Sequence, residues 1–93
     1  MAKKSIMTDN MKACYICGAP RDHIHHIFGG YLSKNRQHSD EDGLFIPVCA
    51  KCHDEIHNGN QALKNGLHMQ AQLKYEQTHT REEFRKRYGK SYL

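Results

Sequence analysis

Four cysteines form two pairs with CxxC spacing, Cys14 with Cys17 and Cys49 with Cys52. Thiolates presented by two such tight turns suit a tetrahedral zinc ion, with Zn–S distances of about 2.3 Å. A complete set of four sulfur ligands leaves no open coordination position, so we expect this zinc to be structural. The 31 residues between Cys17 and Cys49 exceed the usual gap of a compact zinc ribbon. We therefore expect a functional insert between the two pairs.

Two histidines four positions apart, His53 and His57, directly follow the second cysteine pair. On a helix, this spacing places both imidazoles on one face, one turn apart, where they can share a metal ion. Because the four-cysteine site needs no histidine, we expect these two to hold a second, divalent ion. A third imidazole would still leave positions for water and a phosphate oxygen. The alternative for an isolated pair of this spacing is two solvated helix residues.

The third imidazole is expected from a cluster of three histidines, His23, His25 and His26. The pKa of histidine lies near neutral pH, so one member can act as a general base while another binds metal. Side chains alternate along a regular strand, which places the first two on one face and His26 on the other. Either the strand twists strongly at the following glycines, or His23 and His25 are the working pair. The spacing leaves both possibilities open.

Two short strands are predicted to carry and flank these residues. The apolar runs 23–28 and 44–48 have strand character, and Pro47 confines the second strand to an edge or a strand end. The polar, turn-rich segment 31–43 between them is predicted to be a loop. The insert is thus expected to be a strand, a loop and a second strand.

The remainder of the chain is predicted to be helical. A first helix is expected to begin at His53 and to end near Gly59. A second is indicated by apolar residues at four-residue steps, with a possible interruption at Gly66. Thr80 and Glu83 fit a capping box that opens a third helix, which ends at Gly89. The apolar stripe consists of Leu63, Leu67, Ala71 and Tyr75.

The length of 93 residues indicates one small domain. The predicted strands and helices make it an α+β domain. We expect a flexible arm over residues 1–12 and a single domain over 13–93, made of a core (14–59) and a helical extension (60–93). A mean hydropathy of −0.86 implies a marginal hydrophobic core, which a zinc staple would support. The chain contains no apolar run long enough for a membrane span. We expect a cytoplasmic protein whose thiols stay reduced.

Charge is distributed unevenly along the chain, whose formal net charge is +4. Residues 14–59 carry a net charge of −2 and six of the eight histidines, whereas residues 60–93 carry +4. An acidic, histidine-rich middle suits cations, and a basic end suits a polyanion such as DNA. The alternative is that these cations form ordinary solvated helix faces. The candidate contacts to the DNA backbone are Arg36, Lys74, Arg85 and Arg87.

The motifs together resemble the HNH endonuclease family. The likeness is carried by the first cysteine pair, by His25-His26-Ile-Phe-Gly-Gly, and by Ile-Pro-Val-Cys-x-x-Cys-His-x-x-x-His, ending at His57. It covers about residues 14–59, and the stretch from Tyr88 to Leu93 resembles the tail of small phage-encoded members. The resemblance implies a zinc-stapled ββα-metal core, a short antiparallel hairpin plus helix, with two further helices.

The resemblance also implies roles for the histidines. It makes His26 the general base, and it makes His25, His53 and His57 the ligands of a catalytic Mg²⁺, Mn²⁺, Ni²⁺ or Zn²⁺ ion. His23 becomes a bystander or a group behind a ligand. The chain departs from the family at Leu44, which occupies the place of the asparagine that orients the base. Asp42 and Asn35 are candidates to replace that asparagine.

The activity implied is metal-dependent hydrolysis of DNA, giving 5′-phosphate and 3′-hydroxyl ends. One alternative is a non-catalytic zinc module that binds nucleic acid, which Leu44 favours and the complete histidine set disfavours. A second is a zinc-ribbon protein that binds a phage or host protein. If the chain is phage-encoded, its location would be the cytoplasm of the bacterial host.

Overall fold

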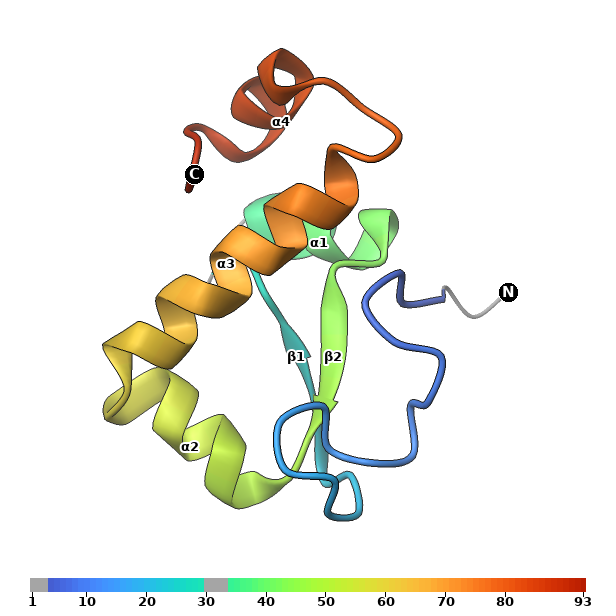
Figure 1. Cartoon of the computed structure of the whole chain (residues 1–93), viewed down its shortest axis with the longest axis vertical. Helices are drawn as coiled ribbons and strands as arrows, with labels where there is room; N and C mark the ends of the chain where they lie inside the picture. Colours follow the sequence, from blue (N-terminus) through green and yellow to red (C-terminus); the bar gives the residue numbers. More distant parts are fainter. Residues whose placement is uncertain (1–3, 30–33) are drawn as a thin grey trace.

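The computed structural model describes residues 4–29 and 34–93 and has an α+β fold, as the sequence predicts. Figure 1 shows α2 and α3 on one side of the two strands and the amino-terminal segment on the other. In these described residues, no helix is both long and apolar enough to cross a membrane. The elements in order are β1 (His23–His26), α1 (Lys34–Asp42), β2 (Phe45–Val48), α2 (Ala50–Asn58), α3 (Gln61–Tyr75) and α4 (Arg81–Tyr88).

The two strands pair antiparallel, with His25 opposite Ile46 and His26 opposite Phe45. Each strand has four residues, so both are shorter than predicted. Strand β2 is buried throughout its length, which explains its continuous apolar sequence. A two-stranded sheet leaves an outer edge on each strand, and Pro47 is tolerated there. The carbonyl oxygen of Pro47 accepts a hydrogen bond of 2.8 Å from the backbone N–H of Tyr15.

Helix α1 replaces most of the loop predicted over 31–43, and that prediction is wrong for residues 34–42. Residues 31–33 of the predicted loop lie outside the described residues, and Gly43 follows the helix as a turn. The helix has no apolar stripe, and its one buried side chain is Ser39. The hydroxyl oxygen of Ser39 accepts a 3.0 Å hydrogen bond from the backbone N–H of Phe28. Tertiary contacts rather than an amphipathic pattern therefore stabilise this helix.

Helix α4 supplies most of those contacts. The Arg87 guanidinium donates to Asp42 at 2.6 Å and to Glu41 at 3.0 Å. The Tyr88 hydroxyl also donates to Asp42, at 2.6 Å. Burial first, and then this hydrogen bond, raise the pKa of Tyr88 well above its usual range, so the phenol stays a donor. Arg87, a predicted DNA contact, thus has its charge balanced inside the fold.

Replacing Asp42 by alanine is expected to destabilise the protein by about 2–3 kcal/mol. The substitution removes two charge-assisted hydrogen bonds and leaves the Arg87 guanidinium, whose side chain is 31% exposed, without this partner. Urea unfolding followed by circular dichroism measures the effect. The exposed pair of Lys86 with Glu82 provides a control, since Glu82→Ala should change stability by less than about 0.5 kcal/mol. Equal effects of the two substitutions would contradict this account.

The carboxyl-terminal helices follow the sequence prediction closely. Thr80 and Glu83 form the predicted capping box, and Gly89 ends α4 with a φ of 97°. Helix α3 runs without the interruption considered at Gly66, because Leu67 and the apolar residues that follow it at four-residue steps bury one face of the helix. An aromatic cluster joins both helices to the end of the first predicted strand; it comprises Phe28, Tyr75, Phe84, Tyr88 and Tyr92.

Part of the predicted amino-terminal arm packs on the domain. The backbone N–H of Ile6 donates to Gly43 at 2.9 Å, and the Ser5 hydroxyl donates to the carbonyl oxygen of Phe45 at 2.6 Å. Met7 is 7% exposed and belongs to the core. Gly43 has a φ of 74°, and a Cβ atom there would lie 2.5 Å from the carbonyl oxygen of Lys4. These contacts fix residues 5–7, and the flexibility expected of the arm stays a prediction elsewhere.

Candidate metal centres

The four cysteines converge at one point, with all four sulfur atoms within 4.8 Å of one another. The Sγ atoms of Cys17 and Cys49 lie 3.6 Å apart, far beyond a disulfide bond and close to the separation of about 3.8 Å across a zinc tetrahedron. All four thiols are free. The cluster can hold a metal ion such as zinc, as the CxxC spacing predicts.

Backbone geometry presents each cysteine pair. In the first pair, the chain turns back at Gly18, which has a φ of 81° and donates from its N–H to the Cys14 carbonyl oxygen at 2.9 Å. In the second pair, Cys49 is the N-cap of α2, and its sulfur accepts from the backbone N–H of Cys52 at 3.5 Å. The second pair is therefore part of the beginning of α2.

The thiol pKa values differ across the cluster. Burial raises the pKa of the Cys14 thiol, but hydrogen bonds from the backbone around Cys17 and Cys49 outweigh it and lower the pKa to about 6. Burial, and then the neighbouring cysteine sulfurs, raise the pKa of Cys52 well above its usual range. One thiolate is thus stabilised while another is opposed. Four thiolates at these distances require a bound cation to balance their charge.

A second cluster lies on the same helix. His53 and His57 project from one face of α2 toward His25 on β1, and one ligand nitrogen from each lies within 4.8 Å of the others. The Nε2 atoms of His53 and His57 are 3.0 Å apart, and the ring centroids of His25 and His57 are 5.2 Å apart. The structure brings together all three imidazoles that the sequence selects. Imidazole nitrogens at this spacing can hold a divalent transition metal.

The pKa values of two of the three imidazoles, His25 and His53, are lowered, which favours the neutral form that binds metal. Burial first, and then the neighbouring histidines, lower the pKa of His25 to about 3. The same two causes lower the pKa of His53. His25 is 8% exposed and forms the floor of the cluster, whereas His57 is exposed at its rim. The site is therefore buried on the strand side and open to solvent at His57 on the helix side.

His26 lies outside the set of three imidazoles whose ligand nitrogens converge. Its Nε2 lies 3.1 Å from the Oδ1 of Asp40, a residue of α1 that sequence reasoning missed. Asp42 and Asn35, which were predicted as possible partners of the base, make other hydrogen bonds. Asp42 accepts from Arg87, and Asn35 donates to the backbone carbonyl oxygen of Tyr88. Leu44 is fully buried in the core. Asp40 could not be identified beforehand, because α1 itself was not predicted.

One pocket is lined both by the imidazole cluster and by His26. A cavity of about 200 Å³ is lined by the imidazole cluster, by His26 and by the predicted DNA contact Arg36. The side chain of His26 is 16% exposed, so it is reachable from this space. The pocket is therefore lined by three imidazoles that could hold a metal ion, by an imidazole hydrogen-bonded to a carboxylate, and by a guanidinium.

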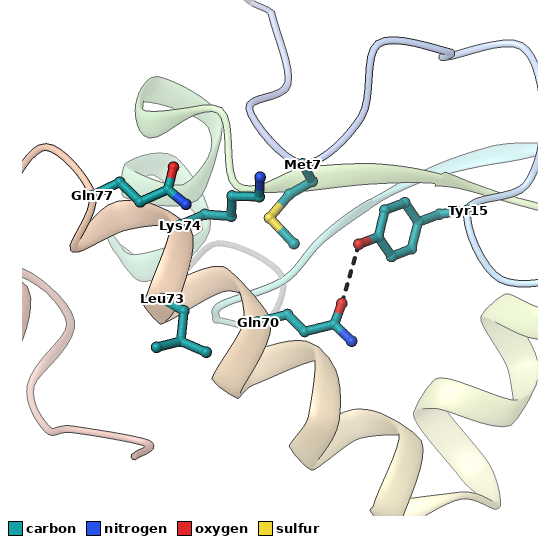
Figure 2. A pocket seen from close by; sticks show the side chains of 6 residues that line it. All are labelled: Met7, Tyr15, Gln70, Leu73, Lys74 and Gln77. Atoms are coloured by element: carbon teal, nitrogen blue, oxygen red, sulfur yellow. Dashed lines mark hydrogen bonds between the residues drawn. The ribbon is translucent and has the colours of Figure 1, made fainter.

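The other predicted DNA contacts lie outside this pocket. Lys74 lines a separate hollow of about 370 Å³ with Met7 and Tyr15. Figure 2 shows Lys74 and Gln70 reaching from α3 toward these residues, with the Tyr15 hydroxyl bonded to Gln70. Arg85 is exposed on α4. Their DNA contacts stay predictions.

Comparison with known proteins gives a family without a named activity. A family model described as protein of unknown function (DUF968) matches residues 9–82. A mitochondrial DNA mismatch repair protein mutS homolog of Sarcophyton glaucum is 44% identical over 48 residues, which are 48% of this chain and 5% of that protein. The chain therefore corresponds to a small part of that relative. No solved structure matches the chain significantly.

The membership in the HNH endonuclease family expected from the motifs is wrong, because the family whose model matches is a different one. The short cysteine and histidine motifs on which the resemblance rested reflect metal-ligand chemistry that unrelated folds also use. What the site can do therefore has to be argued from its own geometry.

Proposed function

The chain belongs to the family described as protein of unknown function (DUF968), and because this description names no activity, we propose from the site itself that the chain is a metal-dependent DNA endonuclease. The observation that carries the proposal is the convergence of His25, His53 and His57, with their ligand nitrogens within 4.8 Å of one another. His26, bonded to Asp40, lines the same pocket. Together these groups provide a cation site and a base for hydrolysis of a phosphodiester.

The cation site has neutral ligands and is open on one side. Three neutral imidazoles leave the full charge of a divalent ion such as Mg²⁺, Mn²⁺, Ni²⁺ or Zn²⁺ uncompensated. When bound, the ion would supply charge neutralisation at the scissile phosphate. The exposed imidazole of His57 marks the side from which a phosphate can approach. The sulfur cluster, with a complete ligand set, keeps a structural role.

The base is His26, positioned by Asp40. The Asp40 carboxylate accepts the hydrogen bond from Nε2–H, which leaves the lone pair on Nδ1 to take a proton from water. The water oxygen then forms a bond to phosphorus while the bond to the leaving oxygen breaks, and solvent protonates that oxygen. Asp40 therefore orients His26 through a side-chain contact. The pair requires α1 to be folded.

Three features support DNA as the substrate. The net charge of the chain is +4, and residues 60–93 contribute a net +4. Arg36 lines the histidine pocket, where its guanidinium suits a phosphate. The similar protein from Sarcophyton glaucum is named for DNA mismatch repair. A cytoplasmic location and a phage or host protein partner stay predictions.

Removal of one predicted ligand should weaken binding at the imidazole cluster and leave binding at the sulfur cluster unchanged. His57→Ala is expected to weaken Mn²⁺ binding by at least about 10-fold, because one of three ligands is lost, while one zinc per chain is retained. Calorimetry with Mn²⁺ and elemental analysis measure the two quantities. His79→Ala removes an exposed imidazole outside both clusters and is the matched control. Unchanged Mn²⁺ affinity in His57→Ala would contradict the cation site.

The deciding experiment is a plasmid-nicking assay with zinc-loaded protein. We expect no cutting without added divalent ion, cutting with Mn²⁺ or Mg²⁺, and loss of cutting in His57→Ala despite retained DNA binding. Binding without cutting under every ion would overturn the nuclease and favour a zinc module that binds nucleic acid. Circular dichroism of each sample confirms that the fold persists.

A further inference from the structure

His23 contacts the imidazole cluster from outside the three predicted ligands. Its Nδ1 lies 3.0 Å from the Nδ1 of His53, and the two ring centroids are 5.1 Å apart. The other ring nitrogen of His53, Nε2, lies 3.0 Å from Nε2 of His57. His53 is therefore held on both sides, with His23 at one nitrogen and the predicted cation site at the other.

Backbone pairing fixes this contact. His23 lies opposite Val48, the last residue of β2, directly before the cysteine that caps α2. The preceding residue, Asp22, donates its N–H to the Val48 carbonyl oxygen at 2.9 Å. Its carboxylate accepts a 2.8 Å hydrogen bond from the N–H of Ala50, the first residue of α2. The beginning of β1 is thus attached to the beginning of the helix that carries His53.

We propose that His23 is a positioning residue that selects the tautomer of His53 in which Nε2 is free to bind metal. Two neutral imidazoles that meet through their Nδ1 atoms bond when one donates and the other accepts. With His23 as the acceptor, Nδ1–H of His53 is the donor, and the lone pair of His53 lies on Nε2, toward His57. The inference rests on the proposed function, because it needs the cation to be held by His25, His53 and His57.

This arrangement differs from that of a fourth ligand. His23 lies outside the set whose nitrogens come within 4.8 Å of one another. An imidazole behind a ligand imidazole fixes its ring orientation and tautomer, and loss of such a partner typically lowers metal affinity 10- to 100-fold. His23 therefore acts on the cation through His53, and it leaves the open coordination positions free.

The test compares His23→Ala with His23→Asn in zinc-loaded protein titrated with Mn²⁺. Alanine removes the acceptor, and we expect about 10- to 100-fold weaker binding. Asparagine offers an oxygen near the place of Nδ1, and we expect it to restore affinity to within a few-fold of wild type. In nuclear magnetic resonance spectra of the metal-free histidines, His53 should show a protonated Nδ1 in wild type and a mixture of tautomers in His23→Ala. Zinc content and thermal unfolding should not change.

Two results separate this inference from the proposed function. Should His53→Ala abolish Mn²⁺ binding while His23→Ala binds like wild type, His23 has no positioning role and the cation site stands. Should His53→Ala itself bind Mn²⁺ like wild type, the cation site is overturned together with everything proposed for it. Equal weakening in His23→Ala and His23→Asn, with an unchanged His53 tautomer, would also overturn the positioning role.

Discussion

His26→Ala is expected to lower the rate of DNA cleavage by about 10²- to 10⁴-fold, the usual contribution of a general base. The imidazole lines the same pocket as the proposed cation site but belongs to neither candidate metal cluster. Removing it should therefore leave zinc content, Mn²⁺ affinity and DNA binding unchanged. Single-turnover cleavage of a labelled duplex at saturating Mn²⁺ measures the chemical step without interference from product release.

The control for this substitution changes the partner of the base instead of the base. Asp40→Asn keeps the size of the side chain and removes its charge, and we expect a smaller loss of rate than in His26→Ala. The double variant should be no slower than His26→Ala alone, because the role proposed for Asp40 is to orient that imidazole. A fully active His26→Ala protein would refute the assignment of the base.

Cys49→Ser is expected to unfold the domain. A structural zinc contributes about 10–16 kcal/mol to the folding of small zinc domains. This is as large as the whole free energy of unfolding of an ordinary protein, about 5–15 kcal/mol. Cys49 is both a sulfur of the cluster and the N-cap of α2, where it accepts from the N–H of Cys52. Serine can restore the cap but is a poor zinc ligand. Circular dichroism and elemental analysis measure helix content and zinc.

Metal removal from the wild-type protein provides the matched comparison. Competition with a strong chelator should produce the same loss of helix signal as the substitution. Added zinc should refold the wild-type chain and leave Cys49→Ser unfolded. A serine variant that melts at the wild-type temperature would show that the hydrophobic core, rather than the sulfur cluster, holds the domain together.

The order of the strands and of the last helices could be predicted from the sequence, whereas the presence of helix α1 could not. Turn residues, alternating and four-residue apolar patterns and the Thr80 capping box predicted both strands and the last helices, because each of these signals is local. Helix α1 has no apolar periodicity, and its stability comes from α4, with Asp42 and Arg87 45 residues apart. Such a contact becomes visible only in the folded chain.

The candidate site shows the same division. The convergence of the cysteines and the pairing of His53 with His57 could be predicted, because regular spacing within a turn or helix fixes the direction of each side chain. Spacing left the contribution of His25 open, and only the resemblance to another family selected it. The partners of these residues depend on α1 and on strand register. Asp40 was therefore missed, and the position of His23 behind a ligand was one of two alternatives that the resemblance implied. The family assignment failed for another reason, since metal ligands at common spacings occur in many lineages.

Helix α1 also has a kinetic consequence. With one buried side chain and mostly polar residues, its amide hydrogens should exchange with deuterium long before those of β2, which is buried throughout. Asp40 leaves its place beside His26 whenever this segment opens, while the two ligand clusters stay assembled. The fraction of molecules with an oriented base would then depend on Tyr88 and Arg87, which contact Asp42 two residues further along α1. Substitutions in α4, remote in sequence from every histidine of the pocket, would thus change turnover by altering how often α1 is closed.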